Sequence, residues 1–190
     1  MTTGTGKAAR SQDRKPRRMG PADGVASHAS HDDDVWLDAR QQQSWRAYIM
    51  GTTLLLGRLD RELRQSWDLS LTEYEVLVRL SEQPDRSLRM ALLADAMSYS
   101  RSRITHTISR MEKAGLVSRT AAEGDRRGVR AVMTDKGYDL LVKAAPTHVA
   151  GVREHLVSLA SRGDFEAVGR VFDRVCDQLI QEHDEAADIR

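Results

Sequence analysis

The feature that most constrains the fold is a basic segment at residues 98–134, where an amphipathic helical pattern is followed by two short β-prone runs. Residues 98–130 carry eight Lys/Arg and three Asp/Glu, whereas the whole chain has a net charge of only +1. Gly115 ends the helical pattern, and the charged residues 123–128 separate the two runs. Such a concentration of positive charge is typical of a nucleic-acid-binding surface. The segment therefore predicts a DNA-recognition helix followed by a β wing.

The helix of this segment has one apolar face. Ile104, Ile108 and Met111 recur at helical spacing and are predicted to be buried. The rest of its surface carries hydroxyls, an imidazole and long cations, namely Arg101, Ser102, Arg103, Thr105, His106, Ser109, Arg110 and Lys113. Arginine can bond to guanine edges and hydroxyls can donate to bases or phosphates, so these residue types suit the DNA major groove. A solvated charged face is the alternative, but residues 98–111 lack the acidic residues that such a face usually contains.

Two shorter helices are predicted before the basic helix. Thr72 and Glu75 have the spacing of a capping box, which predicts a helix from residue 73 to about 82. Another helix is expected from about residue 89 to 97, and Ser100 is expected to cap the basic helix. Together the three helices have the order of a helix-turn-helix.

The wing is predicted from residues 116–120 and 129–133, two short runs of alternating β-prone residues. Arg126 and Arg127 at its tip can enter the narrow, electronegative minor groove beside the recognition helix. Lys113, near the end of that helix, and Arg119, in the first strand, are predicted to contact phosphates.

Long amphipathic helices are predicted on both sides of this lobe, at about 35–67 and 135–185. The apolar stripe of the first is broad and rich in aromatic residues, which indicates packing against a second copy of the chain, with intramolecular core as the alternative. Pro146 is expected to kink or restart the later helix. Cys176 lies on an apolar face, and a buried structural thiol is favoured there over a redox sensor.

Residues 1–34 are expected to be a disordered tail, because they contain almost no large apolar residue. Its basic residues form an arm that either touches phosphates or is only solvated. Its acidic end, residues 31–34, is interpreted as a charged entry to the first helix rather than as a metal site. Residues 35–185 then form one unit, with the DNA-binding lobe at about 70–134. Since neither a membrane span nor a secretory signal is indicated, the cytoplasm is the expected compartment.

Enzyme chemistry is not indicated. The sequence has no dinucleotide-binding glycine motif, P-loop, nucleophile elbow or paired-histidine zinc motif. One cysteine and six scattered histidines do not have the spacing of a structural zinc site. His148 and His155, seven residues apart on one predicted helix, are a candidate metal or ligand pair, but packing is the commoner role. We therefore expect no catalytic site, no cofactor and no metal.

Three sequence motifs resemble the MarR family of winged-helix transcriptional regulators: MEKAGLVSR at 111–119, DRR at 125–127 and MTDKG at 133–137. The resemblance covers about residues 36–185. It implies a mainly α-helical protein with a small two-stranded β wing, in which a helical region forms a homodimer and the lobes bind double-stranded DNA at a pseudo-palindromic operator. It also implies that Asp125 orients Arg127 in the minor groove.

The resemblance further implies a repressor that responds to a small-molecule effector. Trp45, Tyr48 and Ile49 of the first helix are candidate walls of the effector pocket, and core or interface packing is an equally good interpretation of these side chains. A DNA-organising protein of low sequence specificity, built on the same lobe and the basic tail, is the alternative function.

Overall fold

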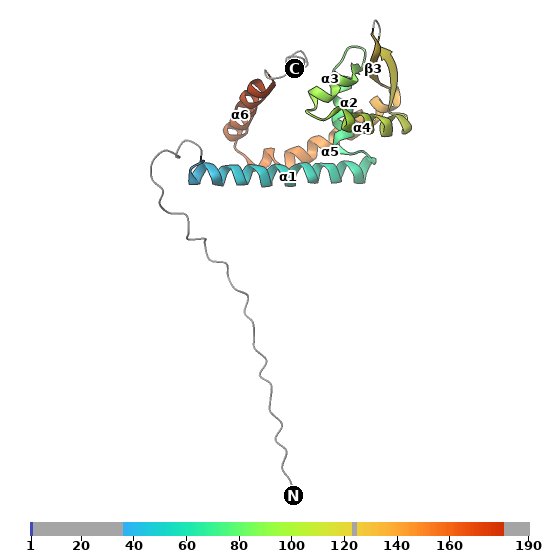
Figure 1. Ribbon diagram of the computed structural model, residues 1–190. Coiled ribbons are helices and arrows are strands. Elements are labelled where there is room, and N and C mark those ends of the chain that lie inside the picture. Colours follow the sequence, from blue (N-terminus) through green and yellow to red (C-terminus); the bar gives the residue numbers. More distant parts are fainter. Residues whose placement is uncertain (2–35, 123–124, 181–190) are drawn as a thin grey trace. The chain divides into compact units, whose positions relative to one another are not determined.

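The computed structural model describes Met1 and residues 36–122 and 125–180, and it is mainly helical with one small sheet (Figure 1). In the described residues the elements are α1 (Ala39–Trp67), α2 (Leu71–Ser81), β1 (Ser87–Arg89), α3 (Met90–Ala96), α4 (Arg101–Lys113), β2 (Val117–Ala122), β3 (Asp125–Met133), α5 (Asp135–His155), the 3₁₀ turn η1 (Val157–Leu159) and α6 (Arg162–Ile180). Among the described residues, those from Ser44 to Ile180 belong to one compact unit. The tail predicted at residues 1–34 lies outside the described residues, apart from Met1.

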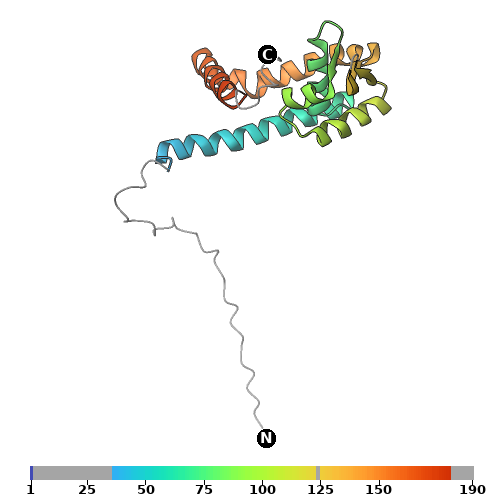
Figure 2. The same cartoon turned by 45° about the horizontal axis from the view of Figure 1, so that its top comes forward.

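Helices α2, α3 and α4 and the sheet form the predicted winged helix-turn-helix lobe (Figures 1 and 2). The sheet has the strand order β1-β3-β2, and both strand pairs are antiparallel. β2 and β3 are the wing, as predicted, although both reach further toward the tip than their β-prone runs. β1 is an addition to the prediction, since three residues are too few to show a strand pattern. It pairs Ser87 with Val132 and Arg89 with Arg130, and so fixes the base of the wing.

The core of the lobe confirms the predicted inner face of α4. Ile104, Ile108 and Met111 are fully buried, and they share a core with Leu77 of α2 and Leu93 of α3. Burial of a side chain of this size contributes about 1.5–3 kcal/mol. This apolar contact fixes the rotation of α4 about its axis, so the opposite face of the helix points outward.

The start of α2 differs from the prediction. Its N-cap is Ser70, whose hydroxyl accepts a hydrogen bond from Glu73 N, while the Glu73 carboxylate accepts one from Ser70 N. The capping box predicted at Thr72 and Glu75 is therefore wrong, and the helix starts two residues earlier. Both serine and threonine are followed by glutamate three residues later, so the motif alone fits either register. The observed register is the one that buries Leu69 before the cap and Tyr74 after it.

The predicted Ser100 cap is confirmed, and the N-terminus of α5 is capped in the same way. Ser100 caps α4 by accepting a hydrogen bond from Arg103 N, and Thr134 caps α5 by accepting one from Gly137 N. α5 runs without interruption through Pro146, so the predicted restart does not occur. The proline side chain is exposed, which lets the ring sit on the outer side of the helix.

The C-terminal half of α1 packs against α5. Trp67 Nε1 donates to Thr147 Oγ1 at 3.0 Å, and Glu62 Oε1 lies 2.9 Å from His155 Nε2. Leu63 of α1 is fully buried in the core of the lobe. These contacts connect the lobe to the long helices on either side of it in the sequence.

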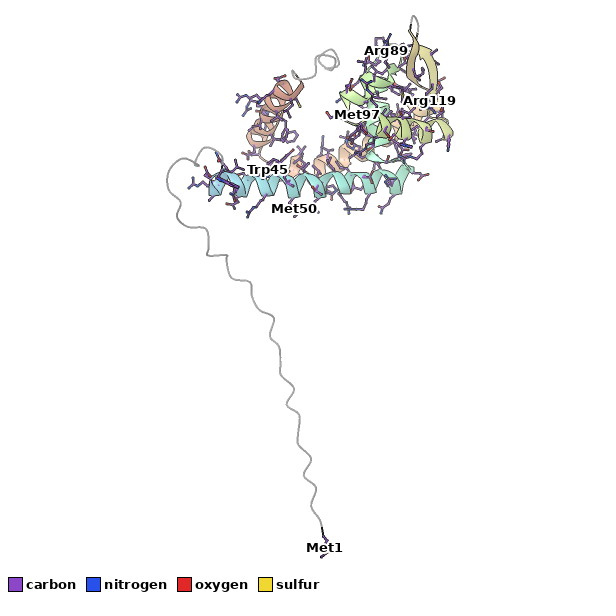
Figure 3. All side chains as sticks on the ribbon, in the orientation of Figure 1. Met1, Trp45, Met50, Arg89, Met97 and Arg119 are labelled. Atoms are coloured by element: carbon purple, nitrogen blue, oxygen red, sulfur yellow. The ribbon has the colours of Figure 1, made fainter. Side chains whose placement is uncertain are left out.

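Elsewhere α1 and α6 expose large apolar side chains: Trp45, Tyr48, Ile49, Met50, Leu54 and Leu56 on α1, and Phe165, Val168, Val171, Val175 and Leu179 on α6. Figure 3 shows Trp45 and Met50 on this part of α1. Cys176 is exposed, which contradicts its predicted burial, because the apolar face of α6 is left largely uncovered within the described chain. None of the helices within the described residues combines the length and the apolar composition that crossing a membrane requires.

Candidate nucleic-acid interface

The outward surface of α4 carries the residues that the sequence assigned to DNA. Arg101, Ser102, Arg103, Thr105, His106, Arg110 and Lys113 are exposed, and Ser109 is half-buried. The guanidinium carbon of Arg103 lies 3.8 Å from the ring centre of Tyr99, in the turn before α4. This cation–π contact holds the arginine at the N-terminal end of the helix, the end that usually reaches base edges.

Arg110, one of the predicted DNA-contacting residues, forms an ion pair within the lobe. Its Nε donates to Glu73 Oε1 at 2.7 Å, so it connects α4 to the first turn of α2. Glu73 as a whole residue is 7% exposed, and its carboxylate also accepts hydrogen bonds from the Ser70 backbone and hydroxyl. Burial alone would raise the pKa of Glu73, but the bonds from Ser70 and Arg110 outweigh burial and lower it. Arg110 therefore helps to fix the angle between α2 and α4.

Arg119 makes a comparable link between α4 and the wing. Its Nε and Nη2 donate to Glu112 Oε2 at 3.0 and 2.6 Å, and its backbone N donates to Oε1. The hydrogen bond from Arg119 holds the pKa of Glu112 below its usual value. The ion pair ties the first strand of the wing to the end of the recognition helix, and it reduces the positive charge that Arg119 offers to a phosphate.

A third arginine ion pair, that of Arg130, fixes the base of the wing. Arg130 of β3 donates to Asp85 Oδ2 at 2.6 Å and also to the Ser87 hydroxyl. Asp85 in turn accepts the Ser87 hydroxyl hydrogen at 2.7 Å. Arg130 contributes to the basic charge counted in the sequence, but its contacts are those of a residue that connects β3 to β1.

A basic cavity of about 430 Å³ lies between α4 and the wing. Its lining includes three arginines from different elements, Arg89, Arg101 and Arg119, together with Thr105 and Gly128. Figure 3 shows Arg89 and Arg119 in this lobe. Arg89 is a candidate phosphate contact that the sequence analysis did not name. It stands at the junction of β1 and α3, and only the fold shows that this junction faces the recognition helix.

The tip of the wing remains a prediction. β3 begins at Asp125, which pairs with Ala122, and the register shifts between Ala121 and Ala122. The side chains of Asp125, Arg126 and Arg127 lie outside the described part of the structure. Their proposed roles in the minor groove are therefore untested.

The candidate effector residues lie on α1. The ring centres of Trp45 and Tyr48 are 5.7 Å apart, and Tyr48 is 5.2 Å from Phe172 of α6. Trp45, Tyr48 and Ile49 line neither the basic cavity nor a second cavity between α2, α3 and α5, so their assignment to a ligand also remains a prediction.

The candidate histidine pair has two different environments. His155 is bonded to Glu62, whereas His148 packs against Tyr74 with ring centres 4.5 Å apart. Among the residues that the structure describes, no three His, Cys, Asp or Glu side chains are grouped as metal ligands.

The three helices, the basic outer surface of α4 and the wing define a winged helix-turn-helix protein. The model of the MarR family matches residues 69–129, which span the lobe from α2 into β3. The solved structure of Sco3205, a MarR family transcriptional regulator from Streptomyces coelicolor in complex with DNA, is 38% identical. It superposes with a TM-score of 0.73, and the match covers 76% of this chain and 94% of that one. The chain belongs to the MarR family of transcriptional regulators.

Curated relatives agree with this assignment. The regulator PecS of Dickeya dadantii is 29% identical over 113 residues, which are 57% of this chain and 68% of that protein. The transcriptional repressor MprA of Escherichia coli K12 is 29% identical over 97 residues, 51% of this chain and 54% of that protein. These relatives are transcriptional regulators rather than enzymes.

Proposed function

We propose that this protein is a ligand-responsive repressor that binds a pseudo-palindromic DNA operator as a homodimer. The observation that carries the proposal is the outer surface of α4, where exposed Arg, Ser, Thr and His side chains stand next to a basic cavity at the wing. Arginine and hydroxyl side chains can read base edges, and a cavity lined by arginines suits a phosphate group.

In this proposal the basic residues of the lobe have different roles, and the ion pairs within the lobe distinguish them. Arg103, His106 and Ser102 are exposed and would read base edges in the major groove. Arg101 lines the basic cavity with Arg89, where both would contact the phosphate backbone. In this proposal Arg110 and Arg119 act mainly by holding α4 against α2 and the wing, through Glu73 and Glu112. Lys113 and the wing-tip residues Asp125, Arg126 and Arg127 keep their predicted roles.

The exposed apolar surfaces of α1 and α6 support the homodimer. A surface of this kind, with Trp45, Leu54 and Val171 among its exposed residues, is unusual on a monomer that stays in water. A two-fold dimer would bury the same patch on both copies, and it would place two recognition helices about 34–36 Å apart on successive major grooves. The exposure of Cys176 fits this arrangement, because its helix face would be covered only by the partner.

A cavity of about 450 Å³ between α2, the end of α3 and α5 is the proposed effector site. Its volume is within the usual range for small-molecule pockets. Met97 and Ser98, which line it, form the turn that leads into α4, and Ser98 has a positive φ of 51°. A ligand there would contact the segment that positions the recognition helix. It could therefore change the DNA affinity by shifting that helix. Repression is the direction suggested by the relative named as a repressor.

DNA selection tests the proposal. The full-length protein would be used to enrich duplexes from a random pool, and the enriched sequences would be compared. A dimeric regulator should yield an inverted repeat with half-sites one helical turn apart. An unpatterned pool would favour the alternative, a DNA-organising protein of low sequence specificity.

A further inference from the structure

Some polar groups that line the proposed effector cavity have no hydrogen-bond partner within the part of the protein that the structure describes. α2 contributes Tyr74, Glu75, Val78, Arg79 and Glu82, the turn after α3 contributes Ala96, Met97 and Ser98, and α5 contributes His148. Met97 is marked in Figure 3, at the end of α3. Glu82 and Arg79 form an ion pair at 3.5 Å, and the other polar groups of the lining are Glu75, His148 and the hydroxyls of Tyr74 and Ser98.

His148 lines the cavity and carries a buried ring nitrogen. Its ring packs on Tyr74, and its Nδ1 is buried without a hydrogen-bond partner among the described residues. Buried polar atoms are nearly always hydrogen-bonded, so an unpaired one at a cavity is a candidate ligand contact. Burial lowers the pKa of His148, which keeps the ring neutral at neutral pH. In the tautomer with the proton on Nε2, Nδ1 accepts a hydrogen bond.

Glu75 is the second lining residue without a hydrogen-bond partner in the described part of the chain. It is half-buried, and it forms no hydrogen bond or ion pair within the described residues. Burial raises the pKa of Glu75, and the charges of Arg79 and Arg103, which lower it, do not outweigh burial. Arg79 pairs with Glu82, and Arg103 lies over Tyr99. A carboxylate in this position lacks the donors that would stabilise its charge.

We propose that this cavity binds a small aromatic molecule that carries a hydrogen-bond-donating nitrogen, such as an amidine or an aromatic amine, and that it excludes carboxylates. The nitrogen donates to the Glu75 carboxylate and to His148 Nδ1, while the flat body lies against Tyr74 and Met97. A carboxylate ligand would instead place its charge near two acidic side chains, Glu75 and Glu82. Arg79, the cation in the lining, is already paired with Glu82. The inference rests on the proposed function only in treating the occupant as an effector.

The test uses three probes of the same shape and different charge: benzamidine, benzamide and benzoate. Their binding to the full-length protein at neutral pH would be measured by ligand-observed NMR, because molecules of this size bind weakly. Benzamidine should bind about tenfold or more tightly than benzoate, with benzamide between them. Glu75→Gln should remove the difference between benzamidine and benzoate.

Two further variants separate the contacts. Glu82→Gln is the matched control on the same helix, and it should keep the preference for benzamidine because Glu82 is already paired with Arg79. His148→Phe keeps a ring against Tyr74 but removes Nδ1, and it should weaken benzamidine and benzamide while leaving benzoate unchanged. Each variant's circular dichroism spectrum and unfolding midpoint would show that it is folded.

Several results would overturn the proposal: equal or tighter binding of benzoate, a preference that survives in Glu75→Gln, or no binding of any probe at millimolar concentration. DNA binding of wild type and of the variants would be measured on the same preparations. Loss of DNA binding by every form would contradict the proposed function, whereas the order of the probes tests only the cavity.

Discussion

Glu73 offers a sharp test of how the recognition helix is held. Its carboxylate lies at the first turn of α2, where it accepts hydrogen bonds from Ser70 N at 2.9 Å, Ser70 Oγ at 2.5 Å and Arg110 Nε at 2.7 Å. Glu73→Ala would keep the backbone bond to Ser70 Oγ but remove the bond from Ser70 N to the carboxylate, at a cost of about 0.5–1.5 kcal/mol. It would also remove a charge-assisted bond of about 1.5–3 kcal/mol, at the lower end of that range because the Arg110 side chain is 60% exposed and can rehydrate.

The expected loss for Glu73→Ala is therefore about 2–3 kcal/mol in the free energy of unfolding. Urea denaturation followed by circular dichroism, at one fixed protein concentration, measures this loss. Glu82→Ala is the matched control, since Glu82 is exposed and makes only a surface ion pair at 3.5 Å, worth less than about 1 kcal/mol. If the two variants were equally stable, the argument from the Glu73 network would be refuted.

The same carboxylate predicts a pH dependence. The pKa of Glu73 is lowered in the folded protein from its usual value of 4.5. A lowered pKa means that its stabilising contribution is complete above the unfolded pKa and is lost as pH falls through the folded pKa. The stability difference between wild type and Glu73→Gln should thus be largest near neutral pH and shrink in acid. A difference that grew on acidification would contradict this sign.

Three other substitutions test the interface and the dimer. Arg127→Ala should weaken DNA binding and lower the slope of log affinity against log salt by about one unit, measured by fluorescence anisotropy at several salt concentrations; unchanged affinity would remove the wing-tip assignment. Arg89→Ala should weaken binding to all sequences about equally, as expected for a phosphate contact, whereas a change in sequence preference would argue for a base contact. Val171→Asp, on the exposed apolar face of α6, should convert the dimer to a monomer by sedimentation at micromolar concentration, with the exposed, paired Glu166→Gln as control. A dimer that persists in Val171→Asp would place the interface elsewhere.

The parts of the fold that were predictable depend on local pattern. The buried face of α4 follows from the spacing of Ile104, Ile108 and Met111, and caps such as Ser100 depend on residues three positions away. The wing was predictable because strand, polar tip and strand follow one another in the chain. The start of α2 was not, since Ser70 and Thr72 offer the same cap motif two residues apart.

The contacts that sequence could not supply join distant segments. Arg110 looks like a free base-reading residue until the fold brings Glu73, 37 positions away, within 2.7 Å. The position of Arg89 beside the wing likewise requires β1, which pairs with β3 across more than forty residues. Burial of Cys176 was predicted from the apolar face of α6, but that face is uncovered in one chain. Periodicity shows that a surface is apolar and leaves open what covers it.

The central claim is that the surface of α4 reads DNA sequence, and a competition measurement tests it most directly. A labelled duplex obtained by selection would be displaced from the full-length protein by unlabelled selected DNA or by random DNA at one salt concentration. The proposed function predicts that the selected duplex competes about 10³-fold or more effectively, and that Arg103→Ala reduces this ratio. Equal competition by the two DNAs would contradict sequence-specific regulation by this protein.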